Sequence, residues 1–555
     1  MTRTGQATSR RAFLRMVAVG AAASSGAMLL AACSSAAPSN TAPATAPTSP
    51  PAAKPTAAAG AAPTTAAAPT TAAAPTTAAA AAPTTAAAAV TPTAAPTEVA
   101  PVATLAPTNL GKNFNSLQLK IGASTEYYAY ALRQFQGQIE KEFSLKLNID
   151  VVPAGDMYQR NLTEFTSGSS SYDMFMFLPF QLPDYAAHLE PLDDLTKGYG
   201  LDLKLDDVLP IFREVYSSWD GKLVSMPFDG DVHLFLYNKD AFGNADLQNK
   251  FKTKYSYDLK PPDTYDQYLD MAQFFTENKW RTDGGQGFGT AEGLGGPEWW
   301  WENRLASYGA VYFDADVKPL INSKNAIAAT DNLVKAGKFM PPGANTFGYQ
   351  EVENALVKGD VAMSINWSSA YRTSTNPQKS TTVGKIGTTM TPGAMVNGKL
   401  VRHDALCTGW SLAIPKYAKN KEAAAYVLWF YSQPEAHLQF IVDPDTGIDA
   451  YRASVLDNPR FVSTYGKDYA QTIKDALGAG FPDLQMLNSS EYYQRLDDGL
   501  KEAIVGSKSV QQAMDDAAAK WSDITQRMGA QRQKDAWSKE SASMKARGIE
   551  YTPLA

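Results

Sequence analysis

Hydrophobic and polar positions follow two different periods in the first part of the predicted folded region. Apolar residues alternate with polar ones in 117–121 and 145–151, which predicts two β-strands. Residues 128–143 and 158–165 carry apolar side chains at helical spacing, and 174–178 is an uninterrupted apolar run. Such a run is typical of a parallel strand that is covered on both faces. The resulting β-α-β-α-β order predicts a mostly parallel sheet with helices on each side.

The rest of the chain is too long for one hydrophobic core, so at least two lobes are expected. Two capping boxes, 264–267 and 509–512, predict helix starts, because their first and fourth residues satisfy each other's backbone N–H groups. Apolar runs at 361–365 and 410–414 predict two further buried strands. The pattern therefore continues as mixed α/β structure and ends in helices.

The N-terminus has the features of an export signal. Arg10 and Arg11 stand in the sequence Ser-Arg-Arg-Ala-Phe-Leu-Arg, a twin-arginine pattern. Residues 16–32 are mildly apolar and rich in Ala and Gly, which favours a signal peptide over a membrane span. They end in Leu-Ala-Ala-Cys, which resembles the bacterial lipobox. We therefore expect 1–33 to be a signal that ends at Cys33. The acylated thiol of Cys33 would anchor the protein to the outer face of the cytoplasmic membrane, which in some bacteria faces the periplasm.

A low-complexity segment, 34–111, follows the signal. It is rich in Ala, Pro and Thr, and Pro-Thr-Thr recurs at Pro63, Pro69, Pro75 and Pro83. The repeated prolines prevent a helix from propagating, and the segment has little apolar surface to bury. The composition predicts a disordered tether between the membrane anchor and the folded region.

Charge and cysteine content exclude some classes of protein. The chain has a net charge of −6, and loss of the four arginines of the signal lowers it to −10. An acidic surface disfavours nucleic acid as a partner. Apart from Cys33, the chain has one thiol, Cys407, so no disulfide can form within the mature protein. Stability is expected to come from a large core.

Motifs of enzymes and metal sites are missing at the spacings that their chemistry needs. The four histidines are isolated, and the folded region has no His-Glu-x-x-His motif, P-loop or Gly-x-Ser-x-Gly elbow. We therefore expect a protein that is not an enzyme and has no catalytic residue, metal or cofactor. A secreted carbohydrate-active hydrolase remains the alternative of a different class, because paired carboxylates are abundant.

Five stretches resemble the family 1 extracellular solute-binding proteins, the maltose-binding-protein-like receptors of ABC importers. They are 219–231 with 236–240, 262–267, 358–363, 409–415 and 420–424. They include Lys-Gly-Asp-Val-Ala-Met and Lys-Glu-Ala-Ala and occur in the family's order. The resemblance implies an α/β, two-lobed periplasmic-binding-protein-like fold of type II, with a ligand cleft between lobes that crossover strands join. It also implies a monomer that captures a small solute and delivers it to the permease subunits of an ABC importer.

The resemblance also suggests how the chain is divided between the lobes. Lobe 1 is expected to comprise 112–235 and 401–435. Lobe 2 is expected to comprise 236–400 and a helical C-terminal segment, 436–555. The similarity ends near residue 527, so the remaining residues have no counterpart.

The candidate ligand-binding residues combine aromatic rings with polar groups, as the apolar faces and hydroxyls of a sugar require. They are Tyr127, Tyr128, Gln181, Asp229, Asp231, Glu298, Trp300, Trp367, Trp410 and Arg452. Those at 127, 128 and 181 follow predicted strands, and ligands of open α/β sheets bind beyond the carboxyl ends of strands. The two aspartates flank Gly230 at the expected passage between lobes.

The tryptophan and arginine candidates come from clusters and from the resemblance. Trp300 is the middle residue of three consecutive tryptophans, with Glu298 at the start of the same predicted helix. Trp367 follows a predicted strand, a place that the family uses for ligand stacking. These groups predict a sugar or oligosaccharide, and the alternative is a polyamine or another small solute, because aspartates and aromatic rings also form cation–π cages.

Overall fold

The computed structural model describes residues 104–407 and 409–554. The predicted export arginines at positions 10 and 11, the acylation site at Cys33 and most of the predicted tether lie outside these residues. Within the described ranges, no helix combines the length and apolarity needed to cross a bilayer.

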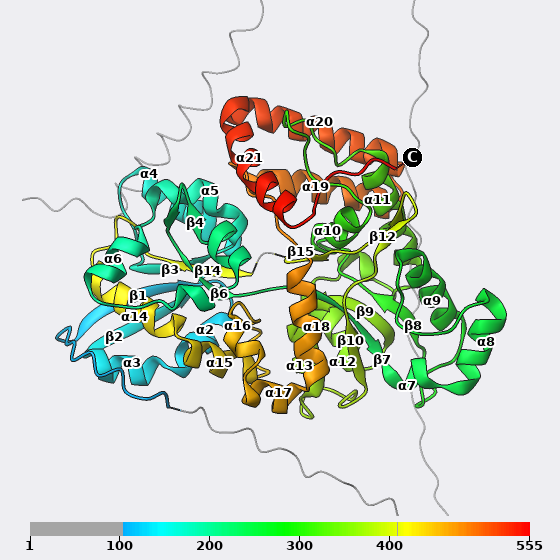
Figure 1. The fold of residues 1–555 in the computed structure, drawn as a ribbon, viewed down its shortest axis with the longest axis horizontal. Coiled ribbons are helices and arrows are strands. Elements are labelled where there is room, and N and C mark those ends of the chain that lie inside the picture. The colour runs from blue at the N-terminus through cyan, green and yellow to red at the C-terminus, as the bar shows by residue number, and fades with distance from the viewer. Residues whose placement is uncertain (1–103, 408, 555) are drawn as a thin grey trace, which may run out of the picture. The chain divides into compact units, whose positions relative to one another are not determined.

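Lobe 1 is built around a five-stranded sheet in the order β2-β1-β3-β14-β6 (Figure 1). The strands are β1 (Leu117–Ala123), β2 (Leu145–Val151), β3 (Met174–Phe177), β6 (Met226–Asp229) and β14 (Trp410–Ala413). β1 pairs in parallel with β2 and β3, which confirms the parallel arrangement predicted from the alternating pattern. β14 is antiparallel to both β3 and β6.

Helices cover this sheet on both sides. They are α2 (Glu126–Gln134), α3 (Gln136–Phe143), α4 (Ala154–Thr166), α14 (Lys421–Ser432) and α15 (Pro434–Val442). The single helical stretch predicted for 128–143 is two helices, because the chain leaves helical geometry at Phe135 (φ −105°, ψ 1°). The ring of Phe135 packs against Phe430 and Phe440, with centroids 5.6 and 5.3 Å away. This contact ties α2 and α3 to the later helices of the lobe.

Lobe 2 contains a four-stranded sheet in the order β10-β7-β9-β8. The strands are β7 (His233–Asn238), β8 (Phe288–Ala291), β9 (Val361–Trp367) and β10 (Ile386–Thr389). The helices that position the site are α9 (Tyr265–Glu277), α10 (Glu298–Ser307), α12 (Tyr349–Val357) and α13 (Ser369–Thr375). The predicted capping box is confirmed, because Thr264 Oγ1 accepts a hydrogen bond from the N–H of Gln267 (3.2 Å) and Gln267 Oε1 accepts one from that of Thr264 (3.4 Å).

A buried ion pair lies under the lobe 2 sheet. The guanidinium of Arg304 donates two hydrogen bonds to Glu292, at 2.6 and 2.8 Å, and both side chains are fully buried. Tyr268 OH donates to the same carboxylate (2.7 Å), and Arg304 Nε donates to Asn332 Oδ1 (2.9 Å). The pair is therefore fully hydrogen-bonded, which is the condition under which charges are tolerated inside a protein.

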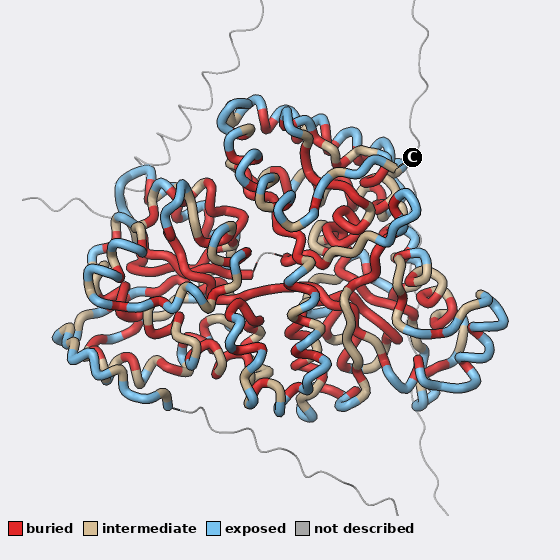
Figure 2. Tube along the Cα trace, in the orientation of Figure 1, coloured by how far each residue is buried: buried red, intermediate tan, exposed pale blue. Residues whose placement is uncertain are grey.

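The chain passes between the lobes more than once. Residues 230–232 connect β6 to β7, and residues 406, 407 and 409 lie between β13 (Asp404–Ala405) and β14. After α15 the chain leaves lobe 1 through 443–452 and α16 (Ala453–Leu456), and α18 (Lys467–Gly478) then packs against β7 and β10. Residues 230–232 and 448–452 are buried, and Figure 2 colours the buried parts of the chain red.

Three long helices close lobe 2: α19 (Ser489–Ile504), α20 (Val510–Met528) and α21 (Ala530–Ala546). The second predicted capping box is half formed, since Ser509 Oγ accepts from the N–H of Gln512 at 3.2 Å. Most of the residues beyond 527, which have no counterpart in the sequence resemblance, lie in α21. Its Trp537 donates to the carbonyl of Asp314 (2.8 Å), and its Lys539 pairs with Asp220 of lobe 1. The last helix therefore touches both lobes.

Candidate functional site

Three carboxyl groups meet where the chain passes between the lobes. Asp229, Asp231 and Asp449 are 1, 6 and 2 % exposed, and one oxygen of each lies within 4.8 Å of the others. Asp229 accepts hydrogen bonds from Tyr128 OH (2.8 Å) and from the N–H of Asp449 (2.6 Å). Gly230 permits this close approach, because a Cβ there would lie 2.5 Å from the carbonyl oxygen of Ala450. The cluster therefore links two connections between the lobes, 230–232 and 443–452.

One guanidinium serves this cluster. Arg372 of α13 donates to Asp449 Oδ1 (3.0 Å), and the N–H of Ser369 donates to Asp449 Oδ2 (3.1 Å). Burial, and then the charge of Asp449, raises the pKa of Asp229 to about 7. Burial and the neighbouring carboxylates hold the pKa of Asp231 well above its ordinary value, and burial also raises the pKa of Asp449. The cluster consequently retains protons at pH values at which exposed aspartates are ionised.

These raised pKa values predict that stability depends on pH. The folded state holds more protons than the unfolded state between about pH 4 and 7, so this contribution to the free energy of unfolding falls as the pH rises through that window. Asp231→Asn removes one proton-binding group but keeps an oxygen acceptor and adds a donor. We expect it to raise the free energy of unfolding at pH 8 by roughly 1–2 kcal/mol and to change it less at pH 5.

Urea unfolding at pH 5, 6, 7 and 8 measures this difference. Asp523→Asn, which changes an exposed aspartate of α20, is the matched control. Its free energy of unfolding should change with pH as that of the unmodified chain does. If Asp231→Asn also runs parallel to the unmodified chain, the carboxyl cluster does not hold the proposed protons.

Aromatic side chains surround the passage between the lobes. The half-buried Trp367 ends β9, and its ring contacts His233, Trp300 and Tyr349, with centroids 4.4, 5.1 and 5.4 Å away. Trp410 begins β14 and lies 5.2 Å from the ring of Tyr128. These rings lie near the carboxyl cluster, and flat aromatic side chains suit the apolar face of a small solute.

Residues of lobe 1 contact lobe 2 around these groups. The ring of Phe180 lies 5.8 Å from Trp299 and 5.0 Å from Tyr493. Tyr127 OH donates to Gln350 Oε1 (3.0 Å). The N–H of Asn488 donates to Asp184 Oδ1 (2.9 Å). The lobes are therefore in contact, as expected of a closed arrangement.

The structure gives three of the remaining sequence-predicted residues, Gln181, Trp300 and Arg452, protein hydrogen-bond partners. Gln181 is 5 % exposed and accepts from the N–H of Leu178 at 3.4 Å. Trp300 is 1 % exposed and its indole donates to the carbonyl of Ile365 (2.6 Å). Arg452 is fully buried and donates to the carbonyls of Leu203 and Ser432. The half-buried Glu298 begins α10, and burial together with Asp497 raises its pKa.

Sequence reasoning missed several residues that the fold brings to this region. They are Phe180, Trp299, Tyr349, Asp449 and Tyr493. Trp299 carried a usable signal, because three consecutive tryptophans on a helix point in directions about 100° apart. Asp449 stands three residues before the predicted Arg452, but nothing local indicates that it meets Asp229.

The carboxyl cluster is also the group of acidic side chains, among the described residues, whose oxygens lie close enough to hold a metal ion. Its oxygens already accept hydrogen bonds from Tyr128, Arg372 and backbone N–H groups. The protons that the carboxyl groups retain would compete with a cation for the same oxygens, so we assign no metal to the cluster.

Comparison with known families identifies a match over most of the folded region. The sequence profile described as bacterial extracellular solute-binding protein matches residues 122–437. A probable amino-acid ABC transporter periplasmic-binding protein of Sinorhizobium fredii is 25 % identical over 432 residues, which are 76 % of this chain and 93 % of that protein. An erythritol/L-threitol-binding protein of Mycolicibacterium smegmatis is 21 % identical over 370 residues, 61 % of this chain and 72 % of that one.

Solved structures share the fold. An ABC transporter solute-binding protein of Agrobacterium radiobacter in complex with ribitol superposes with a TM-score of 0.64 at 20 % identity, over 74 % of this chain and all of that one. Maltose-bound MalE3 of T. maritima gives a TM-score of 0.62, also at 20 % identity, with the same coverage of both chains. At this identity the comparison shows the fold, which is the two-lobed architecture predicted from the sequence.

Proposed function

Because this chain belongs to the bacterial extracellular solute-binding proteins, we propose that it captures a neutral polyhydroxylated solute, a sugar or a polyol, between its lobes. The solute would lie against Tyr128, Trp367 and Trp410, with Asp229 and Asp231 at the passage between the lobes. Closure would then be driven by the greater affinity of the solute for the closed form.

One observation carries the choice of a neutral solute. The cluster combines three buried carboxyl groups with a single guanidinium, yet raised pKa values keep protons on it near pH 7. Protonated and ionised carboxyls donate and accept hydrogen bonds, as hydroxyl groups require. A polyamine would need ionised carboxylates, and its positive charges would repel Arg372. The polyol and sugar complexes of similar structures support the same choice.

The proposal includes delivery and anchoring. A loaded, closed protein would dock on the permease subunits of an ABC importer, as the name of the relative in Sinorhizobium fredii suggests. Acylation of Cys33 would hold it at the membrane, and 34–111 would act as the tether. In this scheme the protein releases its solute unchanged and is not an enzyme.

Thermal unfolding of the purified full chain against a panel of ligands tests the proposal. The panel comprises ribitol, mannitol, erythritol, maltose, amino acids and spermidine. A solute at 100 times its dissociation constant should stabilise the protein by about 2.7 kcal/mol and raise the unfolding midpoint. We expect a polyol or sugar to do this and to be recovered intact.

Other outcomes contradict specific parts of the proposal. Stabilisation by spermidine or an amino acid alone would keep the binding function and exclude the neutral solute. Consumption of a polysaccharide during incubation would identify a hydrolase instead.

A further inference from the structure

A pocket with an apolar floor lies outside the cleft. It has a volume of about 320 Å³, and its walls come from Leu209 and Ile211 of lobe 1, Leu456 of α16, Leu477 of α18 and Arg547 after α21. The side chains of the last two leucines and of the isoleucine are 2–6 % exposed. At its rim, Lys474 and Asp457 pair with each other. The floor is therefore apolar, and Arg547 is the charged residue of the pocket lining that has no oppositely charged partner there.

The guanidinium of Arg547 has no hydrogen-bonding or ion-pair partner within the described ranges, 104–407 and 409–554, although its backbone N–H donates to the carbonyl of Met544 (2.9 Å). Burial lowers its pKa, while the nearby Tyr216 and Glu214 act in the opposite sense. Glu214 is already paired with Arg213, 3.0 Å away. A partly buried guanidinium without its own anion is costly, so an anion that brings two oxygens to it would be favoured.

The cavity on the other side of Arg547 adds no free charge. It has a volume of about 650 Å³ and lies between β4 (Ser218–Trp219) with the turn after it and α21. Its Asp220 pairs with Lys539, and burial holds the pKa of Glu540 well above its ordinary value. Its Gln485 is 5 % exposed, and the side-chain N–H₂ has no partner within the part of the chain that the structure describes. This cavity therefore supplies a hydrogen-bond donor, the N–H₂ of Gln485, and no charge that would neutralise Arg547.

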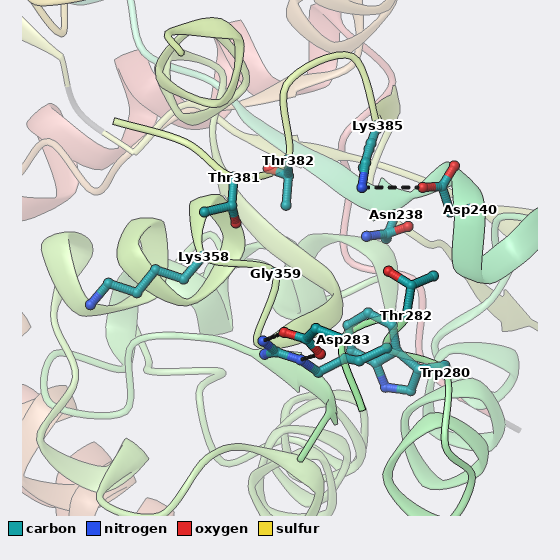
Figure 3. A pocket seen from close by; sticks show the side chains of 11 residues that line it. Asn238, Asp240, Trp280, Thr282, Asp283, Lys358, Gly359, Thr381, Thr382 and Lys385 are labelled. Carbon is teal, nitrogen blue, oxygen red and sulfur yellow. Dashed lines mark hydrogen bonds and ion pairs between the residues drawn. The ribbon is translucent and has the colours of Figure 1, made fainter. Parts of the chain in front are cut away.

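The pocket at the end of β7 shows the contrast. It has a volume of about 190 Å³, and Lys385 pairs with Asp240 across it at 3.6 Å (Figure 3). Arg281 of the same pocket is paired with Asp283 and Asp360. Its arginine is thus already compensated, and it has no comparable apolar floor.

We propose that the apolar pocket and Arg547 bind a small amphiphilic carboxylate, with the hydrocarbon tail between Leu209, Ile211 and Leu477 and the carboxylate on the guanidinium. The planar fork of arginine matches a carboxylate with two parallel hydrogen bonds. Each methylene removed from water adds to the affinity. This site is separate from the cleft and does not depend on which solute the cleft takes.

Isothermal titration of the full chain with sodium octanoate tests this site. We expect saturable binding of one equivalent, at least ten-fold weaker binding in Arg547→Gln, and an intermediate affinity in Arg547→Lys. Leu209→Asn should also weaken binding, because it places an amide on the pocket wall. Arg532→Gln, which removes an exposed arginine from α21, is the matched control and should bind like the unmodified chain.

Chemical controls separate the two halves of the proposal. Acetate lacks the tail, octanol lacks the charge and octylamine reverses it, so each should bind at least ten-fold more weakly than octanoate. Equal affinity for octanol or for acetate would overturn the amphiphilic carboxylate. The site itself is refuted if octanoate does not bind at millimolar concentration, or if Arg547→Gln binds it with unchanged affinity.

Discussion

Glu292→Gln should lower the free energy of unfolding by about 3–5 kcal/mol. The substitution keeps the shape of the side chain but leaves Arg304 as a buried cation without its carboxylate. Arginine cannot lose its proton to escape this cost, since its pKa stays far above neutral even when buried. Urea unfolding at pH 7 measures the loss.

Two comparisons make this prediction specific. Glu277→Gln breaks the exposed pair with Lys254, whose side chains are 49 and 41 % exposed, and should change the free energy of unfolding by less than about 1 kcal/mol. The double variant Glu292→Gln/Arg304→Met should be more stable than Glu292→Gln alone, because it also removes the unpaired charge. If Glu292→Gln and Glu277→Gln lower the free energy of unfolding by the same amount, the buried ion pair does not contribute the stability assigned to it.

Trp367→Ala should weaken binding of the cleft solute by about thirty-fold or more, which corresponds to about 2 kcal/mol. The half-buried ring stands at the carboxyl end of β9 and is held in place by edge contacts with His233 and Trp300. It is therefore preorganised as a flat wall, and its loss removes both apolar area and rigidity. Titration of the solute found in the ligand panel measures the change.

Trp429→Ala is the matched control for this prediction. Trp429 lies on α14 of lobe 1, and its indole donates to the carbonyl of Asp202 at 2.9 Å. Its removal should leave affinity within a factor of about two. A Trp367→Ala protein that folds and binds as tightly as this control would place the solute elsewhere.

The central strands were predictable because burial alone determines their pattern. Alternation at 145–151 marks β2, and the apolar run at 174–178 marks β3, which ends one residue earlier. The break at Phe135 was not predictable, because the apolar spacing continues through it. It depends on the rings of Phe430 and Phe440, which come from helices about 300 residues later in the chain.

The candidate site was predictable only where local sequence carries a signal. Asp229, Asp231, Trp367 and Trp410 stand at strand ends, and the structure brings them to the passage between lobes. On α10 the sequence could not say which tryptophan faces the core. Packing against β9 buries Trp300 and leaves its neighbour Trp299 half-buried. The role of Asp449 could not be predicted, because no short motif reveals that 443–452 connects the lobes beside Asp229.

The position of β14 between β3 and β6 has a consequence for synthesis of the protein. Within the part of the chain that the structure describes, β6 pairs in this sheet with β14 alone, and β14 is made only after all four strands of the lobe 2 sheet. The first lobe therefore cannot complete its sheet on the ribosome until residue 413 has emerged. Pairing over such a sequence distance is slow, because the loop must close before the contacts form. Folding should thus be completed late, because the sheet of the lobe that starts first closes only after all four strands of the second lobe's sheet have been made, and the helices that complete the second lobe follow later still.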